Sequence, residues 1–487
     1  MSSRRFILDI DHSIGGEMRR YTLNNAWQFR LDPNYVLLFE RDPLTKSVSK
    51  TMRLHPTVAA ILTFFNGERS TAEIAQDVSY ILDKSPEEGV AITQHVLSSC
   101  EQAMEQVEVG GHIQTSVLPK ATDILRRYRG DDIVINPYSP LYSPIEVMWN
   151  ITWDCPRRCI YCFAQTNAPT RGHLPLARAL SLVDEMADMG VAFISIGGGD
   201  PFTYPGIIDV LARTCERKID ILTSTKCRLS ETEVIGLREA GIEQLQVSLD
   251  SADPEIAEFL TGSSGYVDDV LNNLQLLRRN GIKIRIKAVM TPYNYKGAGK
   301  LIDFLVEHGA SCIKLEPYGR SAYRHRDDLF FSRSELQELN DLIHEAKQRY
   351  PEIPVQPSDL SFLKDTLKED REAIWAKNSV CGAMSEAMNI HPDGRVLPCE
   401  QVPIRDELVV GDVTQQSLWD IWRSPRAHEV MHPARESFRG QPCYDCEEFD
   451  ECIAKRKWCM RDAYRAYLNT YAPSPKCPRA NGGLRLV

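Results

Sequence analysis

The stretch CPRRCIYC, residues 155–162, places three cysteines within eight positions. Thiols at this spacing can face a single point, but the commonest cysteine-bound metal sites have four ligands. The next histidine, His173, lies eleven residues beyond Cys162. The stretch therefore predicts a metal site with three protein ligands, whose fourth position is left for something else.

Length and charge limit the classes of protein that this chain can represent. Its 487 residues correspond to about three domains. A hydrophobic content of 43% and a charged content of 25% are typical of a globular protein. The chain has 57 basic and 67 acidic residues, a formal net charge of −10, which argues against a nucleic-acid partner.

No segment of the sequence looks like a targeting or membrane segment. The first twenty residues lack an apolar run of signal-peptide length, and VAAILTFF is far shorter than the ~20 residues that span a membrane. We therefore expect a cytoplasmic protein without a membrane partner. In that reducing compartment, the fourteen cysteines indicate metal ligands or catalytic thiols rather than disulfides. Four isolated cysteines fit small buried hydrophobic residues: Cys100, Cys215, Cys227 and Cys312.

Residues 1–110 carry a pattern of strands followed by three helices. YVLLFER and SVSKTMRL are predicted strands. A short apolar helix follows and stops at Gly67, a second helix is capped by Ser70 or Thr71, and a third runs from Pro86 to Gln106. This pattern predicts a winged-helix-like domain. DNA binding is the alternative function for such a domain, and the acidic helices argue against it.

A proline- and tyrosine-rich segment, residues 111–145, is predicted to be a linker. From residue 146 to about 320, a strand followed by a helix recurs six times. The predicted strands are EVMWNIT, VAFISI, IDILTST, QLQVSL, IKIRIKAVM and CIKLEPY, and the helices between them are residues 176–189, 205–218, 231–240, 265–280 and 296–309. Such alternation predicts an α/β fold with parallel strands, either a partial barrel or a doubly wound sheet.

Unusual sequences follow the predicted strands. CPRRCIYC follows the first strand, and the others are GGGDP (197–201), TSTK (223–226), SLD (248–250) and YGR (318–320). Active residues of parallel α/β folds lie at the carboxyl ends of the strands. These motifs are therefore expected to share one site.

Zinc is the alternative occupant of the first cysteine motif, but no fourth ligand lies close to it. Ten clustered cysteines without a conspicuous histidine partner favour iron–sulfur clusters. Three thiolates would hold three irons of a four-iron cube and leave the fourth iron for a small molecule.

The CX3CX2C spacing, with Tyr161 before the last cysteine and six βα units around it, resembles the radical S-adenosylmethionine superfamily. The resemblance implies a partial (β/α)6 TIM-like barrel over residues 146–345. It also implies a [4Fe–4S] cluster on Cys155, Cys159 and Cys162, with S-adenosylmethionine on the open iron. In that family, an electron from a reductant such as flavodoxin or ferredoxin cleaves the cofactor to a 5′-deoxyadenosyl radical, which abstracts a substrate hydrogen atom.

The resemblance extends to the cofactor contacts. GGGDP is similar to the family's Gly-Gly-Glu-Pro, so Gly198, Gly199 and Asp200 are expected at the cofactor, although Asp200 is one methylene shorter than the usual glutamate. Further expected contacts are Tyr161, Ser224, Ser248 and Asp250. Thr261 stands where many relatives have an arginine. The methionine carboxylate is therefore expected to meet Lys226 or Arg285.

The last quarter of the chain, residues 376–487 after a bridging segment at 346–375, resembles the SPASM extension of radical enzymes. The resemblance implies two auxiliary [4Fe–4S] clusters. The outer cluster would use Cys443, Cys446, Cys452 and Cys477, and the inner cluster would use Cys381, Cys399 and Cys459. REAIWAKNSV lacks the further cysteine of fully ligated relatives, so the inner cluster is expected to have an open iron. A pair of structural zinc knuckles is the alternative. MNIHPDGRVLPC predicts a hairpin with its turn at residues 392–394.

Residues 1–110 resemble the recognition element of enzymes that modify ribosomally made peptides, which binds a leader peptide as an added strand. Together the resemblances imply a peptide maturase similar to the sactipeptide and ranthipeptide thioether synthases. Its expected product is a crosslink from a cysteine sulfur to a carbon of a precursor peptide. Carbon–carbon crosslinking, sulfatase-maturating oxidation and a non-enzymatic peptide-binding chaperone are the alternatives.

Overall fold

The structure is a computed structural model that describes residues 19–107, 118–128, 133–164, 172–321, 323–357, 372, 375 and 380–480. The chain divides into two compact units. The first comprises residues 1–43 and 48–137, and the second comprises residues 44–47 and 138–487. Each unit is described by itself.

The first unit contains two small antiparallel sheets. One is a meander of β2 (Trp27–Leu31), β3 (Val36–Arg41) and β4 (Val48–Leu54). The other has the order β5-β1-β6, formed by Asn66–Ser70, Arg20–Leu23 and Met104–Val107. The predicted strands β3 and β4 are confirmed. Gly67 lies within β5, so the expected helix stop is a short strand that pairs with β1.

Four helices pack against these sheets: α1 (Pro56–Leu62), α2 (Thr71–Leu82), α3 (Pro86–Ser99) and α4 (Ala121–Arg127). Ser70 caps α2 through a reciprocal capping box with Glu73, as expected of a serine followed three residues later by glutamate. Helix α3 ends at Ser99 instead of Gln106, because residues 104–107 pair with β1. Helix α4 lies inside the predicted linker, and its Ile124 is fully buried in the core of this unit. Residues 111–117, at the start of the expected linker, fall outside the described residues.

The second unit is built on a ten-stranded sheet in the order β13-β12-β11-β10-β9-β8-β7-β14-β15-β16. Its first seven strands along the chain are β7 (Glu146–Thr152), β8 (Phe193–Gly198), β9 (Asp220–Thr225), β10 (Gln244–Ser248), β11 (Lys283–Met290), β12 (Ala310–Pro317) and β13 (Val355–Pro357). Neighbouring strands from β7 to β13 are parallel. The predicted partial barrel is therefore confirmed.

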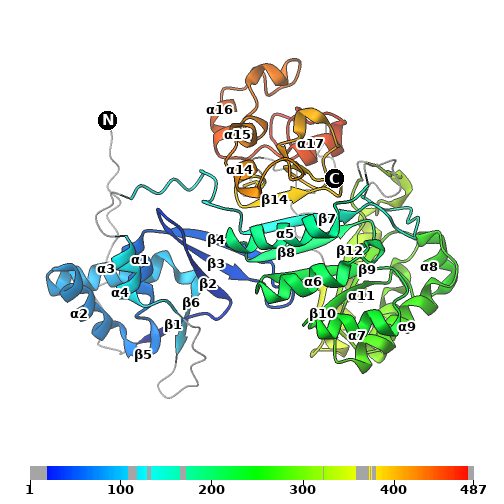
Figure 1. Ribbon diagram of the computed structural model, residues 1–487, viewed down its shortest axis with the longest axis horizontal. Helices are drawn as coiled ribbons and strands as arrows, with labels where there is room; N and C mark the ends of the chain where they lie inside the picture. The colour runs from blue at the N-terminus through cyan, green and yellow to red at the C-terminus, as the bar shows by residue number, and fades with distance from the viewer. Residues whose placement is uncertain are drawn as a thin grey trace. The chain divides into compact units, whose positions relative to one another are not determined.

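Helices cover the outer face of the parallel strands (Figure 1). Those predicted between the strands are α5 (Leu176–Asp188), α6 (Ile207–Glu216), α7 (Glu231–Glu239), α9 (Tyr266–Arg279) and α10 (Ala298–Glu307). Two further helices, α8 (Pro254–Thr261) and α11 (Arg333–Arg349), were not predicted. None of the helices in the described ranges is long and apolar enough to cross a membrane.

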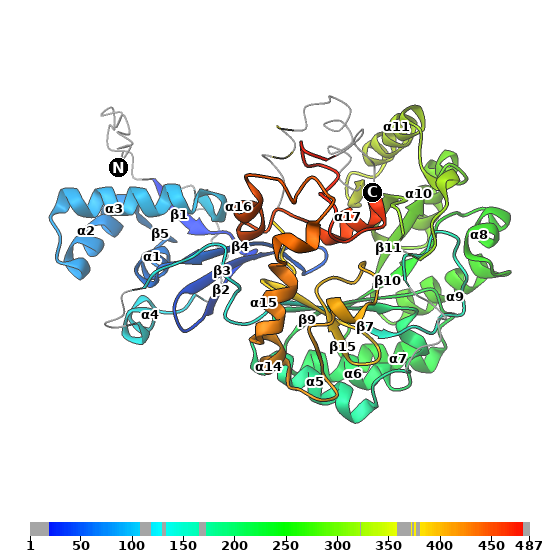
Figure 2. The ribbon, with the colours of Figure 1, turned by 90° about the horizontal axis from the view of Figure 1, so that it is seen from above.

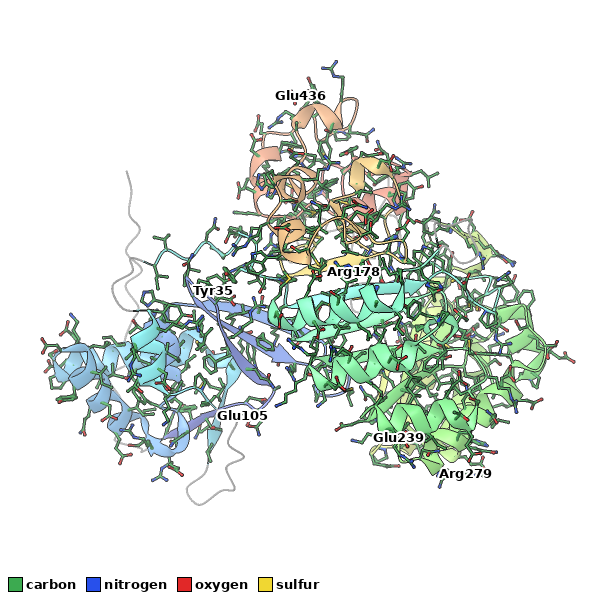
Figure 3. The ribbon with its side chains drawn as sticks, viewed as in Figure 1. Tyr35, Glu105, Arg178, Glu239, Arg279 and Glu436 are labelled. Carbon is green, nitrogen blue, oxygen red and sulfur yellow. The ribbon has the colours of Figure 1, made fainter. Side chains whose placement is uncertain are left out.

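The cysteine-rich C-terminal part continues the barrel sheet. The predicted hairpin forms as β14 (Ala387–Ile390) and β15 (Arg395–Leu397), and β16 (Gly411–Asp412) follows. Strand β14 pairs in parallel with β7, and Asn150 Nδ2 donates to Asn389 Oδ1 over 3.2 Å. Arg178, labelled in Figure 3, extends from α5 and donates to the Val413 carbonyl at 2.9 Å. The helices α14 (Leu418–Trp422), α15 (Pro425–Met431), α16 (Phe449–Ala454) and α17 (Met460–Tyr467) complete this part (Figure 2).

Candidate active site

The first cysteine motif forms a loop that directly follows β7 and packs on the end of α8. The backbone N–H of Arg158 donates to the Thr261 carbonyl at 2.8 Å, and that of Ile160 donates to the Leu260 carbonyl at 3.0 Å. Cys159 and Leu260 also share a small hydrophobic cluster. The loop is thus held by backbone hydrogen bonds and apolar packing before any cofactor binds. Thr261, at the position of the family's arginine, serves in this packing.

The three thiols of the loop lie near one another. Burial raises the pKa of the Cys155 thiol to about 11, and negative charge on Cys159 or Cys162 acts in the same direction. Burial also raises the pKa of Cys159. Neutral thiols are therefore favoured in the metal-free protein, and a metal that binds them must displace their protons.

Lys226 is the cation beside these thiols. Its positive charge opposes the effect of burial on the pKa of Cys159. Its Nζ lies 2.9 Å from Asp250 Oδ2 and 2.9 Å from the Tyr161 hydroxyl, which itself donates to Asp250. Burial disfavours the charge on Lys226, but Asp250, Tyr266 and Cys159 together outweigh burial and raise the lysine pKa well above its usual value. Two of the expected cofactor contacts are thus joined to Tyr161 in one buried network.

The glycine-rich motif after β8 packs against the chain that leads into the cysteine loop. A Cβ on Gly199 would lie 2.1 Å from the Asp154 carbonyl oxygen, and one on Gly198 would lie 2.2 Å from that of Thr152. Gly198 also has a φ of +114°, which side chains disfavour. These glycines are therefore required by backbone packing next to Cys155, whatever the cofactor needs.

Asp200 connects two loops of the site. Its carboxylate accepts hydrogen bonds from the backbone N–H groups of Lys226 at 2.5 Å and Cys227 at 3.1 Å, and from the Thr225 hydroxyl at 3.0 Å. Asp200, which stands where the resemblance leads us to expect glutamate, thus has a structural role: it connects the end of β8 to the end of β9.

The remaining expected contacts are spread along the inner strand positions. Ser224 is the strand partner of Gln246, which in turn is the partner of Arg285. Arg285 is only 4% exposed, and its Nε and Nη1 have no hydrogen-bond partner. The Ser248 carbonyl accepts from the Tyr266 hydroxyl. Of the two cations expected to meet the cofactor carboxylate, Lys226 therefore lies beside the cysteines, while Arg285 lies deeper along its strand.

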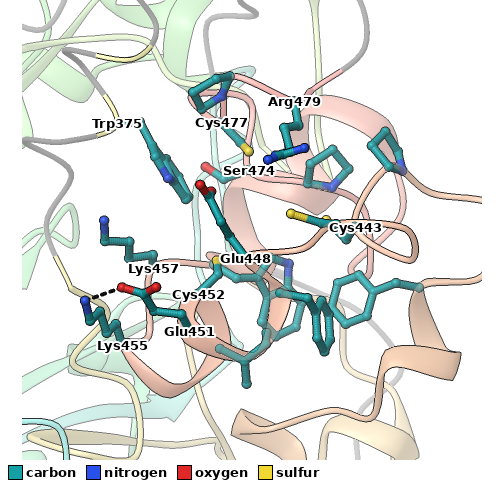
Figure 4. Close-up of a pocket in the computed structure, with 18 of the residues that line it drawn as sticks. Trp375, Cys443, Glu448, Glu451, Cys452, Lys455, Lys457, Ser474, Cys477 and Arg479 are labelled. Atoms are coloured by element: carbon teal, nitrogen blue, oxygen red, sulfur yellow. Dashed lines mark hydrogen bonds and ion pairs between the residues drawn. The ribbon is translucent and has the colours of Figure 1, made fainter. Parts of the chain in front are cut away.

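The four C-terminal cysteines expected to form the outer group all line one cavity of about 670 Å³. Cys443, Cys452 and Cys477 are labelled in Figure 4. Burial raises the pKa of Cys443 to about 12, and charge on any of the other three would raise it too. In the described part of the chain, no group of three or more histidine, cysteine or acidic side chains is arranged to hold a single metal ion.

The cysteines expected to form the inner group also lie together. Burial raises the pKa of Cys399 to about 11 and that of Cys459 to about 12, with Cys381 contributing to both. The positive charges of Arg461 and Arg456 act in the opposite direction on Cys381. The clustered cysteines thus lie near their expected group partners. Their assignment to three groups comes from the resemblance and, like metal binding by each group, stays a prediction.

Comparison with known proteins agrees with this arrangement. Residues 149–305 match the radical SAM superfamily, and residues 381–447 match the SPASM iron–sulfur cluster-binding domain. A PqqA peptide cyclase from Granulibacter bethesdensis is 27% identical over 63% of this chain and 81% of its own length. The mycofactocin maturase MftC of Mycobacterium ulcerans is 24% identical over 71% of this chain and 91% of its own.

Two further proteins show the range of the relatives. An AdoMet-dependent heme synthase from Methanosarcina barkeri is 23% identical over 69% of this chain and 96% of its own length. Among solved structures, Streptococcus suis SuiB bound to S-adenosylmethionine matches with a TM-score of 0.64 and 19% identity, over 94% of this chain and all of that one.

Residues 149–305 are a radical SAM domain, and residues 381–447 are a SPASM domain. Sequence reasoning missed residues that hold the radical SAM loop in place. The Arg157 guanidinium lies 4.8 Å from the centre of the Tyr266 ring and donates to Asp269 at 2.6 Å and to the Lys226 carbonyl at 3.1 Å. Ser321 and Arg324 donate to the carbonyls of Cys162 and Cys159. Only the position of Arg157 inside the cysteine motif pointed to such a role.

Proposed function

We propose that this enzyme matures a ribosomally made precursor peptide by installing an intramolecular crosslink. The observation that carries the proposal is the division of ten cysteines into three separate groups within one chain. A single catalytic cluster needs only the first group, so the other two groups indicate a reaction that handles additional electrons or an additional ligand. The peptide substrate is supported by the relatives named as a peptide cyclase and a maturase, and by the fold shared with SuiB, which has also been solved with its precursor peptide SuiA.

The residues around the first group fit S-adenosylmethionine and a [4Fe–4S] cluster. Three thiols at one strand end suit a cluster with an open iron. The Lys226 ammonium, beside Cys159, would meet the cofactor carboxylate, while Asp250 and Ser248 would face its ribose. When bound, the cofactor and its cluster supply a reductive cleavage that removes a hydrogen atom from the substrate. The protein itself orients these groups and excludes water.

The SPASM residues would hold two auxiliary [4Fe–4S] clusters, which makes three clusters in all. The outer group supplies four thiols and the inner group three. A soft thiolate suits the position that the inner group leaves. The positive charges of Arg456 and Arg461 near Cys381 favour an anionic ligand there. A cysteine of the substrate bound at this position would be held for closure of a thioether, since proximity turns an encounter into an intramolecular step.

The first unit would bind the leader segment of the precursor. Its β2-β3-β4 sheet ends on two strands that each have one neighbour in this sheet, which is the arrangement used when a peptide adds as a further strand. A peptide that contributes one strand and a few apolar anchors binds with about micromolar affinity, roughly −8 kcal/mol. A flavodoxin or ferredoxin would supply the electron.

The test uses a short cysteine-containing peptide encoded next to the gene as the precursor. Under reduction, the complete enzyme should release 5′-deoxyadenosine and lower the peptide mass by two hydrogens per crosslink. A chain that begins at residue 138 should keep the first activity and lose the second. Cleavage of the cofactor without any change in the peptide would contradict peptide maturation. A crosslink that still forms in a peptide without cysteine would show that the product is not a thioether and would favour carbon–carbon crosslinking.

A further inference from the structure

The inner faces of β11 and β12 are directed toward the first cysteine loop. Along β11, Ile284 and Ile286 are buried, and the residues between them alternate to the opposite face. Val289, on that opposite face, packs against the hydrophobic cluster that contains Cys159. Residues that share the face of Val289 therefore point into the barrel interior.

Besides the exposed Lys283 at the start of β11, this face carries four charged residues. They are Arg285, Lys287, Lys314 and Glu316, here called the β11–β12 wall. Lys287 and Lys314 are direct strand partners, and Val289 is the partner of Glu316. The ammonium groups of Lys287 and Lys314 lie 2.7 Å and 2.6 Å from the two oxygens of Glu316. The side chains of these three residues are 38%, 29% and 26% exposed, so solvent reaches the wall although both strands lie within the sheet.

The wall has three cations and a single carboxylate. Burial opposes the charge of Glu316, but the two lysines outweigh it and lower the glutamate pKa, so the carboxylate is ionised at neutral pH. Arg285 has two buried nitrogens without a partner. The adjacent strand partners, Gln246 on β10 and Gln356 on β13, are uncharged. A buried cation without an acceptor is costly, so the wall lacks an anion.

We propose that the β11–β12 wall binds the carboxylate of an aspartate or glutamate in the peptide substrate. This assignment rests on the proposed function and adds a sequence preference to it. The planar guanidinium of Arg285 suits a carboxylate with two parallel hydrogen bonds. Each lysine has three N–H donors and uses one of them on Glu316, which leaves donors for a second carboxylate.

The carboxylate of S-adenosylmethionine is the other source of the same chemistry. It belongs beside the first cysteines, where Lys226 lies. Arg285 precedes Val289 by four residues, roughly 13 Å at ~3.3 Å per strand residue. This distance along the strand places the Arg285 end of the wall deeper in the barrel than the cofactor carboxylate.

The test measures which peptides the complete, cluster-containing enzyme retains in the presence of S-adenosylmethionine. The probe is a synthetic pool of heptapeptides with one cysteine and three positions that each carry Asp, Asn, Glu or Gln. Bound peptides are separated by ultrafiltration and counted by mass spectrometry. Wild type should enrich Asp or Glu over Asn or Gln at one position by about tenfold, the factor that 1.4 kcal/mol gives.

Matched variants locate the preference. Arg285→Met and the double variant K287M/K314M should reduce the enrichment to less than about twofold, whereas Glu316→Gln should increase it because it removes the competing carboxylate. Lys283→Met, an exposed lysine at the start of the same strand, is the control and should keep the wild-type preference. Equal retention of acidic and amide peptides by wild type would overturn the proposal, as would a preference that survives Arg285→Met and K287M/K314M.

A second measurement separates the two carboxylate sources. Binding of radiolabelled S-adenosylmethionine without peptide, followed by equilibrium dialysis, should change less than about twofold in Arg285→Met and K287M/K314M. A tenfold loss would place the cofactor carboxylate on the wall and overturn the proposal. Failure of the proposed function would appear differently, as wild type that cleaves no cofactor under reduction, whatever its peptide preference.

Discussion

Lys226 Nζ and Asp250 Oδ2 lie 2.9 Å apart in the interior of the barrel, with side chains that are 16% and 1% exposed. Asp250 also accepts a hydrogen bond from Tyr161 in the cysteine loop and one of 2.8 Å from the Val289 backbone on β11. One carboxylate therefore ties the end of β9, the cysteine loop and β11 together. The pair holds the cluster-binding loop in the position where the cofactor is proposed to bind.

Replacing one member of this pair leaves the other charge buried and alone. We expect Asp250→Asn to lower the free energy of unfolding by about 3–5 kcal/mol. The double variant K226M/D250N should lose less, because it removes both charges. Denaturant unfolding measures both changes. Asp341→Asn, on the exposed side of α11, should change stability by no more than about 0.5 kcal/mol. A double variant that is less stable than Asp250→Asn would contradict the pairing.

The close approach of Gly199 to Asp154 predicts a selective loss of the first cluster. Gly199→Ala would place a Cβ against the carbonyl of the residue that precedes Cys155, so the loop must shift. We expect a loss of about four irons per chain and retention of the other clusters. Iron analysis and electron paramagnetic resonance measure this loss. Gly297→Ala is the control, since a Cβ at that position would have no neighbouring atom within 4 Å among the described residues. Full iron content in Gly199→Ala would show that a Cβ at residue 199 does not displace the cysteine loop.

The three cysteine groups are expected to bind clusters independently. Alanine at all members of one group should remove about four irons and leave the others. Only the loss of Cys155, Cys159 and Cys162 should abolish 5′-deoxyadenosine formation, because the auxiliary groups are proposed to act after the cofactor is cleaved. Cys215→Ala, in α6, is the control and should retain all iron. Cofactor cleavage in the first-group variant would contradict the assignment.

His391 predicts an acid-dependent loss of stability. It is 1% exposed, and burial lowers its pKa from 6.5 to about 4. The unfolded chain therefore binds a proton between pH 6.5 and 4 that the folded chain does not, so stability falls as the pH drops through this window. From pH 7 to 5.5 the wild type should lose about 1 kcal/mol relative to His391→Gln. His344→Gln, in α11, is the control. Equal pH profiles of wild type and His391→Gln would refute a neutral buried imidazole.

The sequence predicted the parallel strands well because buried strands have a recognisable apolar composition. Central parallel strands have both faces covered, so they appear as nearly continuous apolar runs. VAFISI is such a run, and its last four residues lie in β8. CIKLEPY instead has charged residues at alternate positions, and it forms most of β12. The motifs at the strand ends followed from the same pattern. The grouping of the C-terminal cysteines came from their spacing, through resemblance to a family.

What the sequence did not predict depends on contacts between distant residues. Nothing in a local pattern indicates that β14 pairs with β7, whose partners Asn389 and Met148 are far apart in the chain. The roles of Asp200 and of the Lys226–Asp250 pair likewise depend on loops that meet only in the folded barrel. Helix α4 was hidden by the proline- and tyrosine-rich composition around it, and its apolar residues are few.

Removal of a hydrogen atom from a precursor peptide, by the first cysteine group together with S-adenosylmethionine, is the step on which the proposed function depends. The most direct measurement is the mass of the 5′-deoxyadenosine formed from a peptide with deuterium at its carbon positions. We predict that part of this product carries one deuterium, and that the peptide gains a crosslink. Product without deuterium, formed beside an unchanged peptide, would contradict hydrogen abstraction from the peptide.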